Sequence, residues 1–139
     1  MGRGINYAVA LESALKLKEI AYVYADGYSS SEMKHGAIAL IDADCASVFI
    51  CPNDELKAKN LSNMAEVRAR NGRILAVITE GDAEARQHAD DVIEVPATDS
   101  WFYPYLSIVS LQLFAYFIAL ELGRDIDQPR NLAKSVTVE

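Results

Sequence analysis

A stretch near the amino terminus, ALESALKLKEIAY, carries the densest group of ionisable side chains within an otherwise apolar pattern. Glu12, Lys16 and Glu19 follow one another at i, i+4 and i+7, so a helix would place acid, base and acid on one face. A carboxylate beside an ammonium can move a proton while the cation stabilises developing negative charge. The same spacing also fits an exposed ladder of Glu–Lys pairs without a catalytic role, and spacing alone favours that interpretation.

The sequence has two histidines, His35 and His88. His35 lies in the loop-like segment EMKHG, where an imidazole either shuttles protons near neutral pH or is simply solvated. His88 lies in the polar stretch EARQHADD and is predicted to be at the surface. We find no Ser-His-Asp order, Walker loop, Rossmann fingerprint or metal-ligand spacing, so we expect no metal and no cofactor.

The closing segment, RDIDQPRNLAKSVTVE at residues 124–139, has no helical period and contains Lys134 near its end. Taken alone, such a segment is typical of a mobile terminus. The alternative is a strap that brings Lys134 and a free carboxylate to a site elsewhere in the fold.

Composition limits the classes of function. A chain of 139 residues with 51% hydrophobic residues can bury the core of one domain. A net charge of −7 disfavours nucleic acids and anionic membrane surfaces as partners. Cys45 and Cys51 flank the strand-like SVFI at an even spacing and are predicted to share one buried face as free thiols, which fits the reducing cytoplasm.

No signal-peptide pattern opens the chain, whose start, MGRG, is abrupt. Because a Gly-Arg-Gly turn usually follows another element, we expect a segment to precede it. The first helix is predicted over residues 7–24, with Asn6 as N-cap and Gly27 in a positive-φ conformation after its end. Apolar residues at helical spacing are expected to pack inward: Ala8, Leu11, Leu15 and Tyr22.

Three apolar runs, at residues 46–52, 73–79 and 91–96, are predicted to be buried strands. Between them the sequence predicts a helix at residues 54–71, with Asp54 as N-cap and Asn71-Gly72 as the stop, and a short helix or turn at residues 80–89. Strands without alternating polarity that are separated by helices indicate an α/β fold, a three-layer α/β/α sandwich with a parallel sheet.

The last predicted helix, residues 101–123, is nearly apolar all round and long enough to span a membrane. Gln112, Glu121 and the absence of a basic flank before Trp101 favour a helix buried in the domain or at a subunit interface. We therefore expect no membrane insertion.

Two segments carry a resemblance to a known family. The motifs LKLKEI, KHG followed by ALI, VRAR and DQPRNLAKSVTVE occur in the order found in glutamine–fructose-6-phosphate aminotransferases, also called glucosamine-6-phosphate synthases. Residues 1–139 resemble the second, C-terminal sugar-isomerase (SIS) domain of that family, with residues 124–139 as its tail. The resemblance implies a flavodoxin-like parallel sheet whose first strand would end at GRG and be mostly cut away.

The resemblance also implies a reaction. In the family, a glutaminase domain, absent here, releases ammonia from glutamine. Ammonia forms an imine at C2 of fructose 6-phosphate, and the isomerase half converts this ketose derivative to glucosamine 6-phosphate for amino-sugar synthesis. The implied partners are a sugar phosphate, the glutaminase and first SIS domains of the same full-length chain, and a second copy in a cytoplasmic homodimer.

Site residues are implied one by one. Glu19 matches the carboxylate that moves a proton between C1 and C2, and Lys16 matches the lysine beside the reacting atoms. His35 matches the histidine that opens the sugar ring from the neighbouring subunit. Lys134 matches a tail lysine in the site, and Glu19, Ala133 and Lys134 are expected to contact the sugar, with Glu12 supporting Lys16.

The chain departs from the family at two places. Around His35 it has Ser30, Ser31, Met33 and Ala37 where the family often has AGELKHGP, which predicts a less rigid loop. It also lacks a Ser/Thr-rich phosphate loop, which the family carries in its first SIS domain, so we expect this chain to be inactive alone. The alternatives are a non-catalytic sugar-phosphate-binding SIS module and a related ketose–aldose isomerase.

Overall fold

A computed structural model describes residues 1–131, and its centre is a parallel sheet. The strands β1 (Ala46–Cys51), β2 (Arg73–Thr79) and β3 (Asp91–Val95) pair side by side in the order β1-β2-β3. All are parallel, with Phe49 opposite Ala76 in the first pair. The three predicted strands and their parallel arrangement are therefore confirmed.

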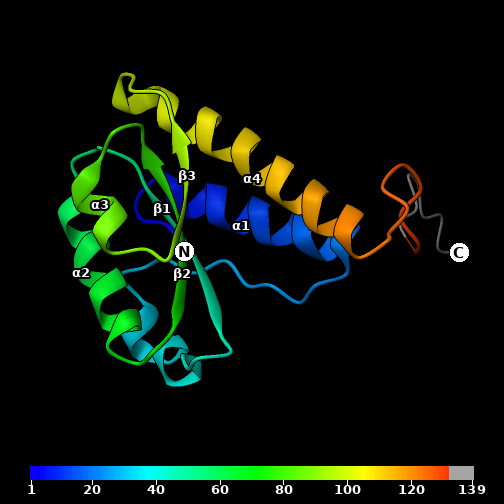
Figure 1. The fold of residues 1–139 in the computed structure, drawn as a ribbon, viewed down its shortest axis with the longest axis horizontal. Coiled ribbons are helices and arrows are strands. Elements are labelled where there is room, and N and C mark those ends of the chain that lie inside the picture. The colour runs from blue at the N-terminus through cyan, green and yellow to red at the C-terminus, as the bar shows by residue number, and fades with distance from the viewer. Residues whose placement is uncertain (132–139) are drawn as a thin grey trace, which may run out of the picture.

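Helices cover both faces of the sheet. They are α1 (Asn6–Lys16), α2 (Lys57–Arg68), α3 (Ala83–Gln87) and α4 (Tyr103–Glu121). Shorter helical turns are a π turn at Leu17–Ala21 and 3₁₀ turns at Met33–His35, Ala37–Leu40 and Ser100–Phe102. Figure 1 shows α2 and α3 on one side of the sheet and α1 and α4 on the other, which confirms the three-layer sandwich.

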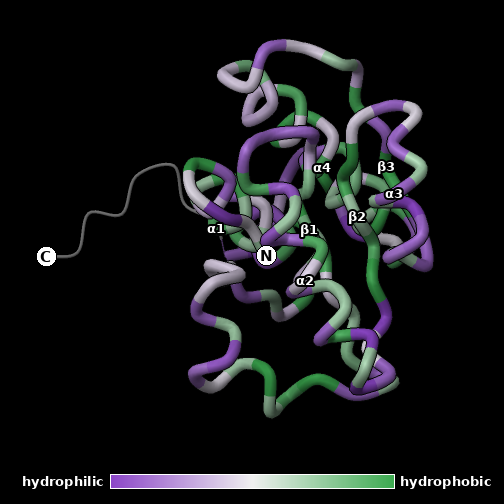
Figure 2. Tube along the Cα trace, turned by 90° about the vertical axis from the view of Figure 1, so that its left-hand side faces the viewer, coloured by the Kyte–Doolittle hydropathy of each residue, from purple (hydrophilic) through white to green (hydrophobic). Residues whose placement is uncertain are grey.

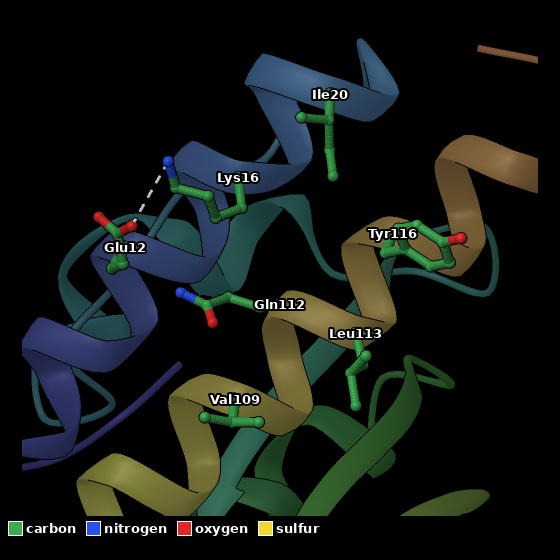
Figure 3. A pocket seen from close by; sticks show the side chains of 7 residues that line it. All are labelled: Glu12, Lys16, Ile20, Val109, Gln112, Leu113 and Tyr116. Atoms are coloured by element: carbon green, nitrogen blue, oxygen red, sulfur yellow. Dashed lines mark ion pairs between the residues drawn. The ribbon is translucent and has the colours of Figure 1, made fainter. Parts of the chain in front are cut away.

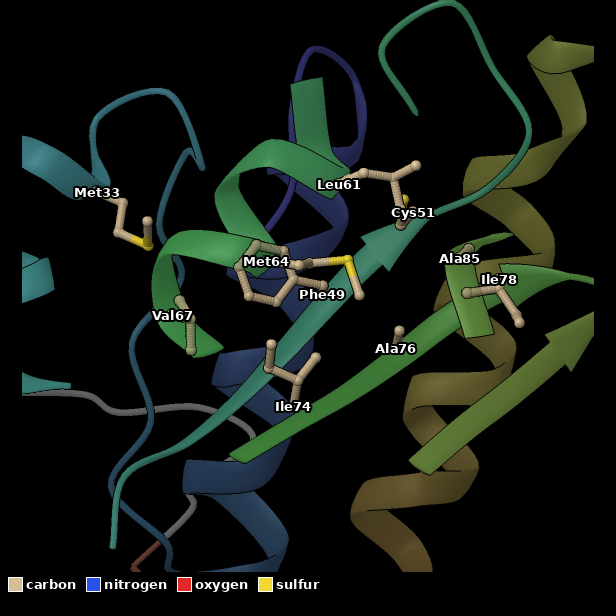
Figure 4. Packing of buried hydrophobic residues seen from close by; sticks show 10 residues of the cluster. All are labelled: Met33, Phe49, Cys51, Leu61, Met64, Val67, Ile74, Ala76, Ile78 and Ala85. Atoms are coloured by element: carbon tan, nitrogen blue, oxygen red, sulfur yellow. The ribbon is translucent and has the colours of Figure 1, made fainter. Parts of the chain in front are cut away.

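Neighbouring strand residues alternate between two cores. Phe49, Ile74 and Ile78 point toward α2 and α3, where they join a cluster completed by Met33, Cys51, Leu61, Met64, Val67, Ala76 and Ala85 (Figure 4). Ile50 and Val77 point the other way and pack with Val9, Ala10, Val95, Tyr103 and Leu111. Because both faces are covered, the strands need no alternation of polarity, and Figure 2 shows hydrophobic residues concentrated on β1 and β2.

The start of α1 differs from the prediction. Ile5 precedes the helix, and Asn6 is its first residue rather than its cap. The Asn6 side chain is buried, and its amide donates to Asp54 Oδ2 at 3.1 Å. The Asn6 side chain was expected to cap the first turn of its own helix, but instead it links α1 to the loop after β1.

The buried face of α1 also differs from the prediction. Val9, Ala10 and Ala14 are buried, whereas Leu11 is 45% and Leu15 is 42% exposed. Ala8 is exposed too, and Tyr22 is half-buried. Leucine side chains were expected to drive packing, but the small residues form the face along which α1 meets the rest of the domain.

Gly27 is needed for a close approach and not for a positive φ. A Cβ at this position would lie 2.7 Å from Leu11 Cα, so the loop after α1 passes directly against the helix backbone. The left-handed residue that ends the helical segment is Tyr22, with φ 58° and ψ 32°.

At α2, the predicted stop is confirmed and the predicted cap is not. Asn71 has φ 61°, and the N–H of Gly72 donates to Val67 O at 3.1 Å. Asp54 accepts from the N–H of Leu56 at 2.9 Å but lies in the turn before the helix, which begins at Lys57.

The cysteines and the second histidine follow the predictions in part. Cys51 is fully buried, and burial raises the pKa of its thiol to about 12. Cys45 lies just before β1 and is partly exposed, so the two thiols do not share one buried face. His88 is half-buried, not fully at the surface.

The amino-terminal residues lie between β1 and the segment at residues 28–30. Met1 O accepts from the N–H of Ile50 at 2.9 Å, and Gly2 forms a parallel bridge with Ser29. These residues run where the sequence led us to expect the end of a first strand.

Within the described residues, one helical segment, Ser100–Glu121, is long and apolar enough to cross a membrane by length and composition. One side of it packs on the sheet and α1 through Tyr103, Pro104, Ser107, Leu111, Ala115 and Ala119. Its other side is exposed and apolar, at Tyr105, Val109, Leu113, Tyr116, Phe117 and Leu120. The predicted burial within the domain therefore holds for one face only.

Candidate functional site

The predicted acid–base group is assembled at the carboxyl-terminal end of α1. Lys16 is the last residue of the α-helix, and Glu19 lies in the π turn that follows. Lys16 Nζ is 2.5 Å from Glu19 Oε2 and 3.6 Å from Glu12 Oε1. The structure thus brings together the three residues that the spacing placed on one face. Single π turns occur frequently at functional sites.

The electrostatics of this group hold the lysine as a cation. The hydrogen bond that Lys16 donates to Glu19 is the main cause that raises the pKa of Lys16, partial burial opposes it, and the charges of Glu19 and Glu12 add to the increase. The side chains of Lys16 and Glu19 are 29% and 25% exposed, so both remain reachable from outside. A reachable carboxylate fixed by an ammonium is suited to proton transfer next to an atom that gains negative charge.

A cleft of about 390 Å³ opens beside this group, between α1 and α4. Its lining is shown in Figure 3 and consists of Glu12, Lys16, Ile20, Val109, Gln112, Leu113 and Tyr116. The Gln112 amide extends from α4 toward α1, and the ammonium of Lys16 turns toward Glu12 (Figure 3). Apolar walls with a few polar groups are typical of a small-molecule site or of a surface that another domain covers.

Sequence reasoning missed a contact between this region and the segment after α4. The backbone N–H of Arg130 donates to Tyr22 Oη at 2.8 Å. The guanidinium carbons of Arg124 and Arg130 lie 5.4 Å and 4.3 Å from the centre of the Tyr22 ring. Figure 1 shows this segment, in orange, beside the end of α1. No local pattern signals a contact between residues 108 positions apart.

His35 does not join the group within this chain. It ends the 3₁₀ turn Met33–His35, and its neighbour Lys34 pairs with Glu66 of α2 at 2.7 Å. The His35 side chain is 76% exposed, and its Nε2 is 3.9 Å from Glu32 Oε2. Its imidazole is therefore largely exposed, and it lies near Glu32 and not near the Lys16–Glu19 pair. Lys134 and Ala133 lie outside the described residues.

The carboxyl ends of β1 and β2, where open α/β sheets commonly bind ligands, are acidic here. The loop after β1 reads PNDEL, and the Asp54 carboxylate in it is occupied by N–H groups of Asn6 and Leu56. After β2, Asp82 Oδ2 pairs with Lys57 Nζ at 2.7 Å. Acidic side chains disfavour a phosphate, in line with the missing Ser/Thr-rich loop.

No group of three or more His, Cys, Asp or Glu side chains close enough to hold a metal ion occurs among residues 1–131.

Comparison with known proteins defines the class. The SIS domain family model matches residues 1–122, and the chain belongs to this family. The chain is 53% identical over its whole length to a glutamine–fructose-6-phosphate aminotransferase of Aquifex aeolicus and 54% identical to that of Bacteroides thetaiotaomicron. It spans 24% and 23% of the length of these two relatives.

A solved structure agrees with this assignment. The C-terminal domain of glucosamine-fructose-6-phosphate aminotransferase from Francisella tularensis superposes with a TM-score of 0.84 at 42% identity. The match covers 91% of this chain and 36% of that one, so the solved domain contains much more protein than the part that corresponds to this chain.

Proposed function

We propose that the chain is the C-terminal SIS domain of a glutamine–fructose-6-phosphate aminotransferase and supplies the acid–base group of its isomerase half. The ion pair between Lys16 and Glu19, with Lys16 at the edge of the cleft, carries this proposal, because a ketose–aldose isomerisation uses a base beside a cation. Identity above 50% to aminotransferases over the whole chain supports the choice of reaction.

The proposed step is a proton transfer between adjacent carbons. Glu19 removes a proton from C1 of the C2 imine of open-chain fructose 6-phosphate, and the electron pair forms the enolamine. The imine nitrogen takes up a proton as the enolamine forms. The same carboxyl group then returns the proton from C1 to C2, while the C1 hydroxyl gives its proton to solvent and becomes the aldehyde, which gives the aldose glucosamine 6-phosphate. Lys16 stabilises negative charge on the C1–C2–O unit, Glu12 holds Lys16 in place, and His35 of a second subunit opens the ring.

The proposal includes partners. The acidic loops at the carboxyl ends of β1 and β2 leave the phosphate to be bound by a first SIS domain of the same full-length chain. A glutaminase domain supplies ammonia, and a second subunit in a homodimer supplies the histidine. Lys134 and Ala133 complete the sugar contacts from the tail. Two free cysteines fit a cytoplasmic protein.

A chimera tests the proposal. The matched C-terminal quarter of the Aquifex aeolicus aminotransferase is replaced by this chain, and glucosamine 6-phosphate formation is measured. We expect activity with the wild-type sequence and a loss of at least about 100-fold with Glu19→Gln, because the base is removed while the shape is kept. Glu80→Gln, the same change at an exposed carboxylate outside this group, is the matched control and should retain most activity.

An active chimera that is unaffected by Glu19→Gln would overturn the assignment of the base. An inactive wild-type chimera, together with tight binding of fructose 6-phosphate to the isolated chain in calorimetry, would favour a non-catalytic sugar-phosphate-binding module.

A further inference from the structure

Tyr22 connects two parts of the chain that bear on the same site. We propose that Tyr22 is a positioning residue, which anchors the segment beginning at Arg124 to the end of the helix that carries Lys16 and Glu19. The proposal names a residue whose role is to hold another segment in place, with no contact to the reacting atoms.

Three contacts converge on this one side chain. The hydroxyl accepts the backbone N–H of Arg130 at 2.8 Å, and guanidinium groups of Arg124 and Arg130 lie over the ring at 5.4 Å and 4.3 Å. The ring face attracts cations through its quadrupole, and guanidinium groups stack on aromatic rings particularly well. Because the hydroxyl contact is made to backbone, it fixes the path of the chain as well as a side chain.

The backbone conformation of Tyr22 is unfavourable for a large side chain, which indicates that the contacts of this side chain stabilise the fold. Tyr22 adopts a left-handed conformation at φ 58°, directly after the π turn. Glycine or asparagine is the usual residue where a helix ends in this conformation, since it avoids the steric cost. A tyrosine at this position retains the steric cost of the left-handed conformation, and its contacts with the two arginines offset that cost.

Within the segment after α4, local contacts set the turn that Tyr22 holds. The N–H of Arg124 donates to Ala119 O at 2.9 Å, which continues the end of α4. Asp125 Oδ1 accepts from the N–H groups of Asp127 and Gln128 at 3.1 Å and 3.0 Å. These local hydrogen bonds therefore set the shape of residues 124–130, and Tyr22 holds these residues against the end of the helical segment that begins with α1.

The consequence for the site rests on the proposed function. Tyr22 is three residues after Glu19, and Arg130 is four residues before Lys134. An anchored Arg130 therefore fixes the point at which the chain leaves its described part, next to the helical segment that carries Lys16 and Glu19.

Amide hydrogen exchange tests the anchor without any activity. In the 139-residue chain, Tyr22→Phe should speed exchange of the Arg130 amide roughly fivefold, because its acceptor is lost while the ring remains. Tyr22→Leu removes ring and hydroxyl and should speed it further. Tyr24→Phe is the matched control, since the Tyr24 hydroxyl donates to Asp26 and not to the tail. Unchanged Arg130 exchange in both Tyr22 variants, or an equal effect of Tyr24→Phe, would overturn the proposal.

Kinetics of the chimera separate this proposal from the proposed function. If Tyr22 positions the tail, Tyr22→Leu should raise KM for fructose 6-phosphate severalfold and Tyr22→Phe should lie between it and the wild type, while Tyr24→Phe matches the wild type. An active chimera with unchanged KM in both variants would overturn the positioning role. An inactive wild-type chimera with faster Arg130 exchange would count against the proposed function and leave the anchor supported.

Discussion

Lys16 Nζ lies 2.5 Å from Glu19 Oε2, and the two residues stand on either side of the point where α1 changes from an α-helix to a π turn. A Glu–Lys ladder on a regular helix is usually exposed and weak. Here both side chains are about three-quarters covered, and a cleft opens next to Lys16. The pair is therefore more covered than an ordinary surface ladder, and its lysine borders a cleft.

Lys16→Met should lower the kcat of the chimera by about 100-fold, because the cation that stabilises charge next to Glu19 is lost. The side chain is similar in length, so packing along α1 is retained. Lys18→Met is the matched control on the same turn, since Lys18 is exposed, and it should keep near wild-type activity. Equal effects of the two substitutions, measured by product formation, would contradict a special role for Lys16.

Gly27→Ala should destabilise the domain by about 1–3 kcal/mol, because the new Cβ would lie 2.7 Å from Leu11 Cα and must push the loop off α1. Gly36→Ala is the control, since no heavy atom lies within 4 Å of its added Cβ. Urea unfolding followed by circular dichroism measures both. A Gly27→Ala variant as stable as Gly36→Ala would show that the close approach does not constrain the loop.

Asp82→Asn should cost about 2 kcal/mol at neutral pH, because it weakens a nearly buried contact with Lys57 and the N-cap contact to Ala85. Glu84 also pairs with Lys57, at 3.0 Å, but is 67% exposed, so Glu84→Gln should cost under about 0.5 kcal/mol. Urea unfolding at pH 7 compares the two variants.

The same contact predicts an acid dependence. Burial opposes ionisation of Asp82, but the hydrogen bonds from Lys57 and Ala85 prevail and hold the pKa of its carboxyl below the usual value. The contribution to stability is therefore complete above the unfolded pKa of about 4 and is lost as the pH falls through the lower, folded pKa. The difference between the wild type and Asp82→Asn should shrink from pH 6 to pH 3, and a constant difference would contradict this account.

Iodoacetamide should modify Cys45 and spare Cys51 in the folded chain. Burial raises the pKa of the Cys51 thiol to about 12, which leaves almost no thiolate and no access at neutral pH. Mass spectrometry should find one label in the native chain and two after unfolding in urea. Modification of Cys51 as fast as Cys45 would mean that β1 opens readily.

Much of the fold follows from local sequence. The three strands are uninterrupted apolar runs, and their lack of alternation already indicates a sheet that is covered on both faces. The stop at Asn71-Gly72 depends on the local chemistry of a left-handed residue and was predictable for that reason. The resemblance of LKLKEI and the tail motif also led to the family that the comparisons confirm.

The sequence predictions that were wrong concern residues whose tertiary contacts override their local preference. Asn6 is a good cap by type, but its side chain donates to Asp54, 48 residues away. Leu11 and Leu15 look like core residues, yet the sheet and α4 pack on the face of α1 that carries Val9 and Ala10.

The sequence by itself determined the strands, the order of the layers and the acid–base–acid spacing of Glu12, Lys16 and Glu19, because each depends on residues within a few turns of one another. Only the tertiary structure decided which face of α1 is buried, that a cleft lies beside Lys16, and that Tyr22 meets Arg130. These features depend on contacts between distant segments, whose energies no local pattern encodes.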